Sequence, residues 1–94
     1  MQKKTGGEIA ADYLIAEEVP FVCGIPGHGD MGLFDALKDR TDQISLVKPR
    51  HEQSAAHIAD AYYRASGNPL ATVTSIGPGS VNTIVGLATS YVDS

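Results

Sequence analysis

Three short segments of the chain combine glycine or proline with polar side chains that could do chemistry. His28 and Asp30 lie in the first, His51 and Glu52 in the second, and a Gly-Pro-Gly turn at 77–79 in the third. A positioned carboxylate or imidazole can move a proton, and a glycine turn lets the backbone approach a flat ligand. These residue types suggest a small-molecule site with acid–base chemistry, provided that the fold brings the segments together.

Each of these residues also has a simpler interpretation. Glu52 could be a surface carboxylate favoured by the dipole of a helix N-terminus. His28 could be a turn residue between two glycines, and Asp30 could be the N-cap of a helix that begins at Met31. The Gly-Pro-Gly turn has neither the lysine of a P-loop nor the spacing of a dinucleotide fingerprint, so a plain tight turn is the stronger interpretation.

A zinc site on the segment after residue 50 is excluded by spacing. His51 and His57 are six residues apart, whereas two histidines that chelate zinc from one helix are four apart. The single cysteine, Cys23, also excludes an internal disulfide and a zinc site built from several cysteines.

The apolar pattern predicts helices that alternate with short strands. Helices are predicted at about 5–18, 31–38, 52–66 and 81–88, and strands at 21–25, 44–47 and 70–74. Thr5 and Glu8 have the capping-box spacing, Gly67 fits a C-terminal cap, and Ser80 can cap the last helix. This alternation predicts an α/β fold with a doubly wound parallel sheet, because each crossover helix must cover a sheet face.

In such a sheet the loops at 26–30, 49–53 and 75–80 each follow a strand and precede a helix. All three then lie at the carboxyl edge, where open α/β sheets bind ligands. Three strands are few for this fold, so we expect a truncated domain or a fragment of a larger protein.

Composition restricts the partners. The chain has 94 residues, 43% of them hydrophobic and 19% charged, which corresponds to at most one small domain. A net charge of -4 and no basic cluster larger than Lys3 and Lys4 argue against nucleic acid. The longest uncharged stretch, 65–92, is broken by glycine and proline, so no membrane span is expected. The N-terminus does not resemble a signal peptide, and the expected location is cytoplasmic.

Four segments carry a resemblance to a known family. They are 21–27 (FVCGIPG), 50–67 (RHEQSAAHIADAYYRASG), 74–82 (TSIGPGSVN) and 86–94 (GLATSYVDS). In order and spacing they resemble the pyrimidine-binding (PYR) domain of thiamine-diphosphate-dependent enzymes of the acetolactate synthase, pyruvate oxidase and 2-keto acid decarboxylase group. The resemblance covers nearly the whole chain and implies that residues 1–94 form the N-terminal part of a PYR domain.

The resemblance implies a role for each matched residue. Glu52 matches the glutamate that hydrogen-bonds N1′ of the cofactor's aminopyrimidine ring, which favours the tautomer that removes the proton from C2 of the thiazolium. His28 is a second catalytic candidate, as a proton-transfer group. The residues expected to contact the cofactor are Pro26, Gly27, Glu52, Ser75, Pro78 and Asn82.

The resemblance also implies cofactors and partners. Thiamine diphosphate would bridge two subunits of a homodimer or tetramer, and a separate pyrophosphate-binding domain would hold the diphosphate and Mg²⁺. That domain's Gly-Asp-Gly motif does not occur in this chain. We therefore expect the 94 residues alone to be inactive and poorly folded. The implied substrate is a 2-keto acid or related carbonyl compound, and whether FAD also binds is left open.

Alternatives remain open at this point. Among carboligases, decarboxylases, oxidases and hydrolases the subclass is undecided, and residues 27–29 (GHG) resemble the cyclic-dione hydrolase branch of the family. A non-catalytic α/β module that binds a nucleotide or a protein is the alternative from another class. It would be favoured if Glu52 lay buried against an arginine, or if no second domain were encoded downstream.

Overall fold

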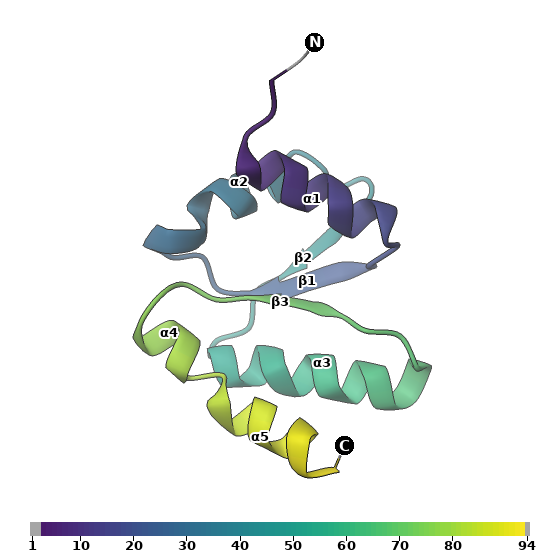
Figure 1. Ribbon diagram of the computed structural model, residues 1–94, viewed down its shortest axis with the longest axis vertical. Helices are drawn as coiled ribbons and strands as arrows, with labels where there is room; N and C mark the ends of the chain where they lie inside the picture. Colours follow the sequence, from purple (N-terminus) through teal and green to yellow (C-terminus); the bar gives the residue numbers. More distant parts are fainter. Residues whose placement is uncertain (1–2, 94) are drawn as a thin grey trace.

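The computed structural model describes residues 3–93 and has a three-stranded sheet at its centre (Figure 1). The strands are β1 (Phe21–Gly24), β2 (Ser45–Val47) and β3 (Ala71–Val73). β1 lies in the middle and pairs in parallel with both neighbours, in the order β2-β1-β3. The predicted α/β fold with a parallel sheet is therefore confirmed.

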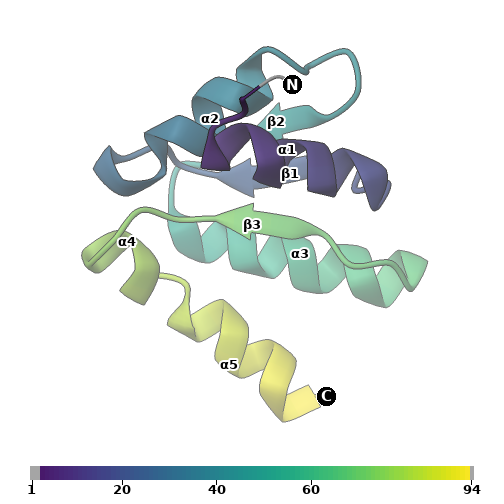
Figure 2. The same ribbon diagram turned by 45° about the horizontal axis from the view of Figure 1, so that its top comes forward.

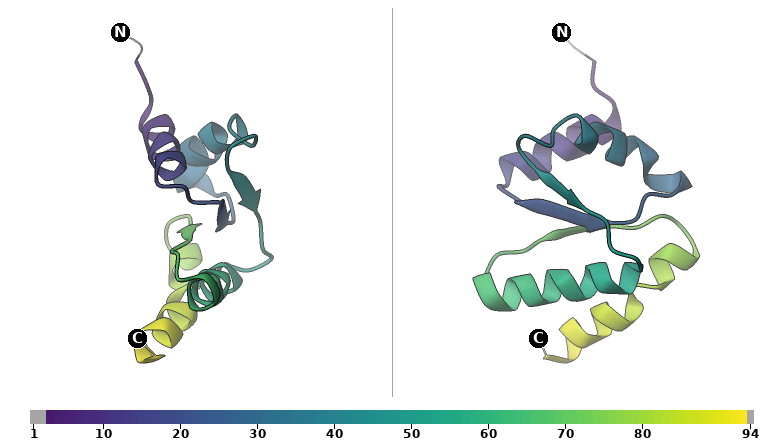
Figure 3. Two further views of the ribbon diagram at one scale, coloured as in Figure 1. Left: turned by 90° about the vertical axis from the view of Figure 1, so that its right-hand side faces the viewer. Right: turned by 180° about the vertical axis from the view of Figure 1, so that it is seen from behind.

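Helices cover both faces of the sheet. They are α1 (Gly6–Ala16), α2 (Met31–Lys38), α3 (Glu52–Ser66), α4 (Pro78–Val81) and α5 (Ile84–Asp93), with a 3₁₀ turn, η1, at His28–Asp30. α1 and α2 pack on each other on one side of the sheet, whereas α3 lies on the other side with α5 packed against it (Figures 1 and 3). Among residues 3–93 no helix is long and apolar enough to cross a membrane.

The best-packed part of the core lies between β1 and the pair α1–α2. Val22, Leu37 and Ile44 are fully buried there. Val22 also pairs with Leu46 on one side and Ala71 on the other. The central strand is apolar throughout because it is covered on both faces, as expected for a parallel sheet.

α1 begins at the predicted capping box. Thr5 Oγ1 accepts a hydrogen bond from the Glu8 N–H (3.2 Å), and Glu8 Oε1 accepts one from the Thr5 N–H (3.0 Å). The helix ends at Ala16, earlier than predicted. The chain turns through Glu18, whose φ of 61° is left-handed, before it reaches Pro20.

The predicted single helix at 81–88, capped by Ser80, is wrong. α4 begins at Pro78 instead, where proline suits the first helical position, and its N-cap Gly77 has a φ of 69° that favours glycine. The helical path then breaks before α5. Thr83 Oγ1 donates to the Ser80 carbonyl across this break (2.7 Å).

Candidate functional site

The three loops that follow the strands meet at one edge of the sheet. In Figure 2 the arrowheads of β1 and β3 point towards this edge, where α4 lies. The first and third loops touch, because the Gly29 N–H donates to Ser75 Oγ (3.3 Å). A Cβ atom added at Gly27 would overlap the Ser75 side chain, so the two backbones approach closely at this point. Glycine at residue 27 therefore permits the contact between the loops.

The second loop places Glu52 at the first residue of α3. His51 is the N-cap, and its Nδ1 accepts a hydrogen bond from the Gln53 N–H (3.0 Å). This bond satisfies one of the free N–H groups at the helix start. The half-buried Glu52 side chain extends from this helix end towards the third loop.

Glu52 is joined to the end of α4 by a hydrogen bond. The Asn82 Nδ2 amide donates to Glu52 Oε1 over 3.0 Å, although the two residues are 30 positions apart in the sequence. This bond, followed by the Glu52 backbone N–H, holds the pKa of the Glu52 carboxyl below its ordinary value. Charge on His51 acts in the same direction and partial burial in the opposite one. The carboxyl is therefore ionised at neutral pH.

The second oxygen of Glu52 lies beside the Gly-Pro-Gly turn. A Cβ atom added at Gly79 would come to 3.2 Å from Glu52 Oε2, and to 3.9 Å from the Ser75 Cβ. A glycine at this position therefore keeps the space beside the oxygen clear. An ionised carboxylate with one oxygen beside such a turn can accept a hydrogen bond from an N–H group of a flat ring.

Three of the residues predicted to belong to the site lie exposed at this edge of the sheet. Pro26, His28 and Pro78 are exposed. Between residues 3 and 93 the structure gives the His28 imidazole no hydrogen bond, so its predicted proton transfer has no geometric support from a partner.

Asp30 is the N-cap residue of α2, as its position before Met31 predicted, but its side chain makes no capping hydrogen bond to that helix. Its Oδ1 accepts a hydrogen bond from the Gly27 N–H over 2.6 Å, which closes the first loop on itself. The side chain is buried, and Oδ2 has no hydrogen-bond partner within the described residues. Sequence reasoning missed this loop-closing role, although an acidic residue three positions after a helix N-cap can reach back to the N-cap N–H, as in a capping box.

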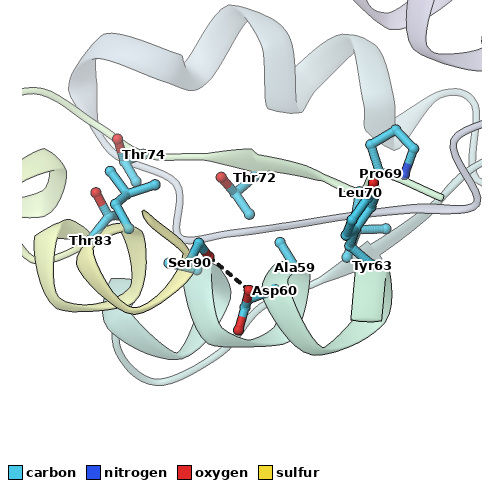
Figure 4. Close-up of a pocket in the computed structure, with 11 residues that line it drawn as sticks. Ala59, Asp60, Tyr63, Pro69, Leu70, Thr72, Thr74, Thr83 and Ser90 are labelled. Atoms are coloured by element: carbon cyan, nitrogen blue, oxygen red, sulfur yellow. Dashed lines mark hydrogen bonds between the residues drawn. The ribbon is translucent and has the colours of Figure 1, made fainter. Parts of the chain in front are cut away.

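A separate hollow of about 490 Å³ lies between α3, β3 and α5 (Figure 4). Thr72, Thr74 and Thr83 line one part of it, and Ser90 Oγ donates to Asp60 Oδ1 in another (2.8 Å). This bond, Arg64 and the His57 charge keep the pKa of the Asp60 carboxyl below its ordinary value. The lining includes none of the predicted site residues, and sequence reasoning did not single out Asp60 or Ser90.

The first condition for a non-catalytic module, a Glu52 buried against an arginine, is not met in the described part of the chain. Glu52 there bonds to an amide, and the ion pairs of arginine involve Glu8, Asp12 and Asp60 instead. The geometry thus leaves Glu52 half-exposed at the sheet edge with a neutral partner.

Comparison with known proteins gives consistent matches. Residues 4–94 match the family model described as thiamine pyrophosphate enzyme, N-terminal TPP binding domain. The chain is 43% identical over 89 residues to a probable acetolactate synthase large subunit of Methanocaldococcus jannaschii (95% of the chain, 15% of that protein). It is 39% identical over 94 residues to the acetolactate synthase isozyme 3 large subunit of Escherichia coli (100% and 16%). A mitochondrial acetolactate synthase catalytic subunit of Aspergillus candidus is 38% identical over 90 residues (96% and 13%). The chain thus spans 13 to 16% of the length of these relatives.

Proposed function

This chain belongs to the family of thiamine pyrophosphate enzyme N-terminal TPP-binding domains, and we propose that it binds the aminopyrimidine ring of thiamine diphosphate beside Glu52. The proposal rests on one observation above all. Glu52 is an ionised carboxylate with Oε1 held by Asn82 and Oε2 beside Gly79, at the edge where the three loops meet.

The residues at this edge fit such a ring. The glycine at residue 79 leaves room beside Oε2 for a planar group, and the half-buried Ser75 lies next to Gly79 and in contact with Gly27. Pro26 and Pro78 are exposed at the rim, where their rings could contact a flat ligand. In this proposal Pro26, Gly27, Ser75, Pro78 and Asn82 complete the cofactor site around Glu52.

The cofactor supplies an acidic C2–H group and an electron sink, and the protein supplies position and charge. Glu52 accepts a hydrogen bond from the ring at N1′ and holds the ring in the protonation state that the reaction needs. A positioned acid–base group of this kind contributes roughly a hundred- to ten-thousand-fold in rate.

We propose further that a full-length protein with this sequence acts on 2-keto acids, since its relatives include acetolactate synthases. In that protein, residues 1–94 are the N-terminal part of the PYR domain, and a separate domain holds the diphosphate and Mg²⁺. A homodimer or tetramer would pair the two kinds of domain. His28 at the rim would transfer a proton to the substrate, so His28→Ala should change the rate or the product ratio.

Glu52→Gln tests the role of the carboxylate. In the full-length protein loaded with thiamine diphosphate and Mg²⁺, this variant should keep the fold and slow proton exchange at C2 by roughly a hundred- to ten-thousand-fold. The exchange is followed by NMR after acid quenching. Glu17→Gln, which changes an exposed glutamate at the end of α1, is the matched control and should leave the rate unchanged. An exchange rate in Glu52→Gln equal to that of the control would overturn the assignment.

A further inference from the structure

We propose that Asn82 is a positioning residue for Glu52, holding Oε1 through its amide so that Oε2 is presented to the ligand. The inference rests on the proposed function of Glu52. In this inference Asn82 orients the Glu52 carboxylate, in addition to the contact with the cofactor that its sequence position predicts.

The backbone around Asn82 fixes where its side chain can reach. Its N–H donates to the Pro78 carbonyl (2.9 Å), which closes the single turn of α4. The next residue, Thr83, is buried and donates from both its N–H and its hydroxyl to the Ser80 carbonyl (3.2 and 2.7 Å). Hydrogen bonds from Asn82 and Thr83 thus fix the backbone at the break between α4 and α5. The Asn82 amide is held next to the start of α3.

The bond to Asn82 makes the two oxygens of Glu52 inequivalent. Oε1 accepts the amide N–H over 3.0 Å, whereas Oε2 lies beside Gly79. A carboxylate that accepts a hydrogen bond keeps its charge, because the bond favours the ionised form. The ligand would therefore meet an oriented, charged acceptor at Oε2.

A purely structural role for Asn82 has a counterpart nearby with which it can be compared. Ser90 on α5 also bonds across 30 residues to α3, through the Asp60 carboxylate (2.8 Å). That bond joins the same parts of the fold without touching Glu52. If Asn82 only attached the C-terminal helices, Ser90→Ala and Asn82→Ala should have the same consequences.

The test is an NMR titration of the full-length protein with no ligand, using ¹³C-labelled glutamate carboxyl groups. Glu52→Gln assigns the Glu52 signal directly. We expect Glu52 to titrate below ordinary glutamate, and its pKa to rise in Asn82→Ala and rise further in Asn82→Asp. Asp keeps the shape of Asn but replaces the amide donor by a like charge. Ser90→Ala should leave the Glu52 titration unchanged.

A second measurement uses the unaltered chain, so the inference can be tested even if the Asn82 variants do not fold. The Asn82 side-chain amide protons should shift with pH at the midpoint of Glu52, and this shift should vanish in Glu52→Gln. Amide protons that ignore the Glu52 titration, or a Glu52 pKa that is unchanged in both Asn82 variants, would overturn the inference.

The same variants separate the inference from the proposed function. In the full-length protein with thiamine diphosphate, Asn82→Ala should move the acid limb of C2 proton exchange to higher pH, and Ser90→Ala should not. A shifted Glu52 titration without any change in exchange would support the coupling and overturn the proposed function.

Discussion

Asp12 is the residue through which charge joins α1 to the end of α2. Its Oδ2 accepts from Lys4 Nζ (2.7 Å) and its Oδ1 from Arg40 Nε (2.8 Å). Arg40 also donates to the Ala36 carbonyl (2.8 Å), which orients the guanidinium. Lys4 first, and then Arg40, hold the pKa of the Asp12 carboxyl below its ordinary value.

These contacts predict how stability depends on pH. The pKa of Asp12 is lower in the folded chain than in the unfolded chain, so its contribution is present at neutral pH and is lost as the pH falls through the folded value. Asp12→Asn should lower the free energy of unfolding at pH 7 and give a shallower loss below about pH 4. Urea unfolding across this range measures both effects.

Asp35→Asn is the control for this measurement, because Asp35 is an exposed aspartate on α2. It should follow the pH dependence of the unaltered chain. If Asp12→Asn also followed it, the contacts of Asp12 with Lys4 and Arg40 would contribute nothing to stability.

The contact between α3 and α5 depends on a glycine. Gly86 is buried, and a Cβ atom added there would overlap the Ala56 Cβ on α3. Gly86→Ala should therefore push the helices apart and destabilise the chain by about 1–3 kcal/mol, the usual effect of overpacking. Urea unfolding measures the loss.

Gly32→Ala is the matched control, since Gly32 is a helical glycine on α2 with nothing within 4 Å of an added Cβ. Alanine favours helix over glycine by up to about 1 kcal/mol, so this variant should be neutral or more stable. Equal stability changes in the two variants would mean that α5 is not packed on α3 as the structure places it.

The apolar periodicity of the sequence was sufficient to predict those helices and strands that depend on local residue patterns. The three strands lie within the predicted ranges, and each is shorter than predicted by one or two residues. Gly67 ends α3 with a φ of 79° and an N–H bonded to the Tyr63 carbonyl, as its position after the helical pattern predicted. The break before α5 was not predicted in this way: the Thr83 hydroxyl bonds locally to the Ser80 carbonyl, but the Asn82 amide beside it bonds to Glu52, 30 residues away.

The candidate site was predictable in outline and not in its contacts. The order of strands and helices placed the loops at one edge, but by position alone Glu52 was a surface carboxylate, and only the family resemblance singled it out. That Asn82 would bond to it could not be inferred, since a hydrogen bond across 30 residues has no signature in local spacing. Asp30 is at the predicted N-cap position of α2, but its side chain closes the first loop instead of bonding to the helix.

The two sides of the sheet differ in how well they are buried. On the side of α1 and α2, large side chains such as Leu37 and Ile44 are fully enclosed. On the other side, Ala55 and Ala56 are the buried apolar residues of α3, and α5 leaves Tyr91 86% exposed. The other large apolar side chains that are exposed after β3 are those of Ile76, Val81, Ile84, Val85, Leu87 and Val92.

This asymmetry predicts a gradient of local stability across the molecule. Segments with few buried apolar contacts open at lower free energy than the core strands. In the full-length protein without ligand, amide protons of α5 should therefore exchange with solvent faster than those of β1, as measured by hydrogen exchange with NMR or mass spectrometry. Similar protection of the two elements would contradict the prediction.

The predicted difference in local stability affects the candidate site, because one part of the site belongs to the stable region and another part lies next to the less stable one. Glu52 lies at the start of α3, whereas Asn82 lies between α4 and the more exposed helix α5. Opening of α5 should release Asn82 and with it the orientation of the carboxylate. A ligand that binds Glu52 only in the oriented state must favour the state in which α5 is closed, because a ligand shifts such an equilibrium by its difference in affinity for the two states.

Thiamine diphosphate bound to the full-length protein should therefore slow amide hydrogen exchange in α4 and α5 more than in α1. Equal slowing in all three helices would show that Asn82 and the C-terminal helices are not coupled to the site.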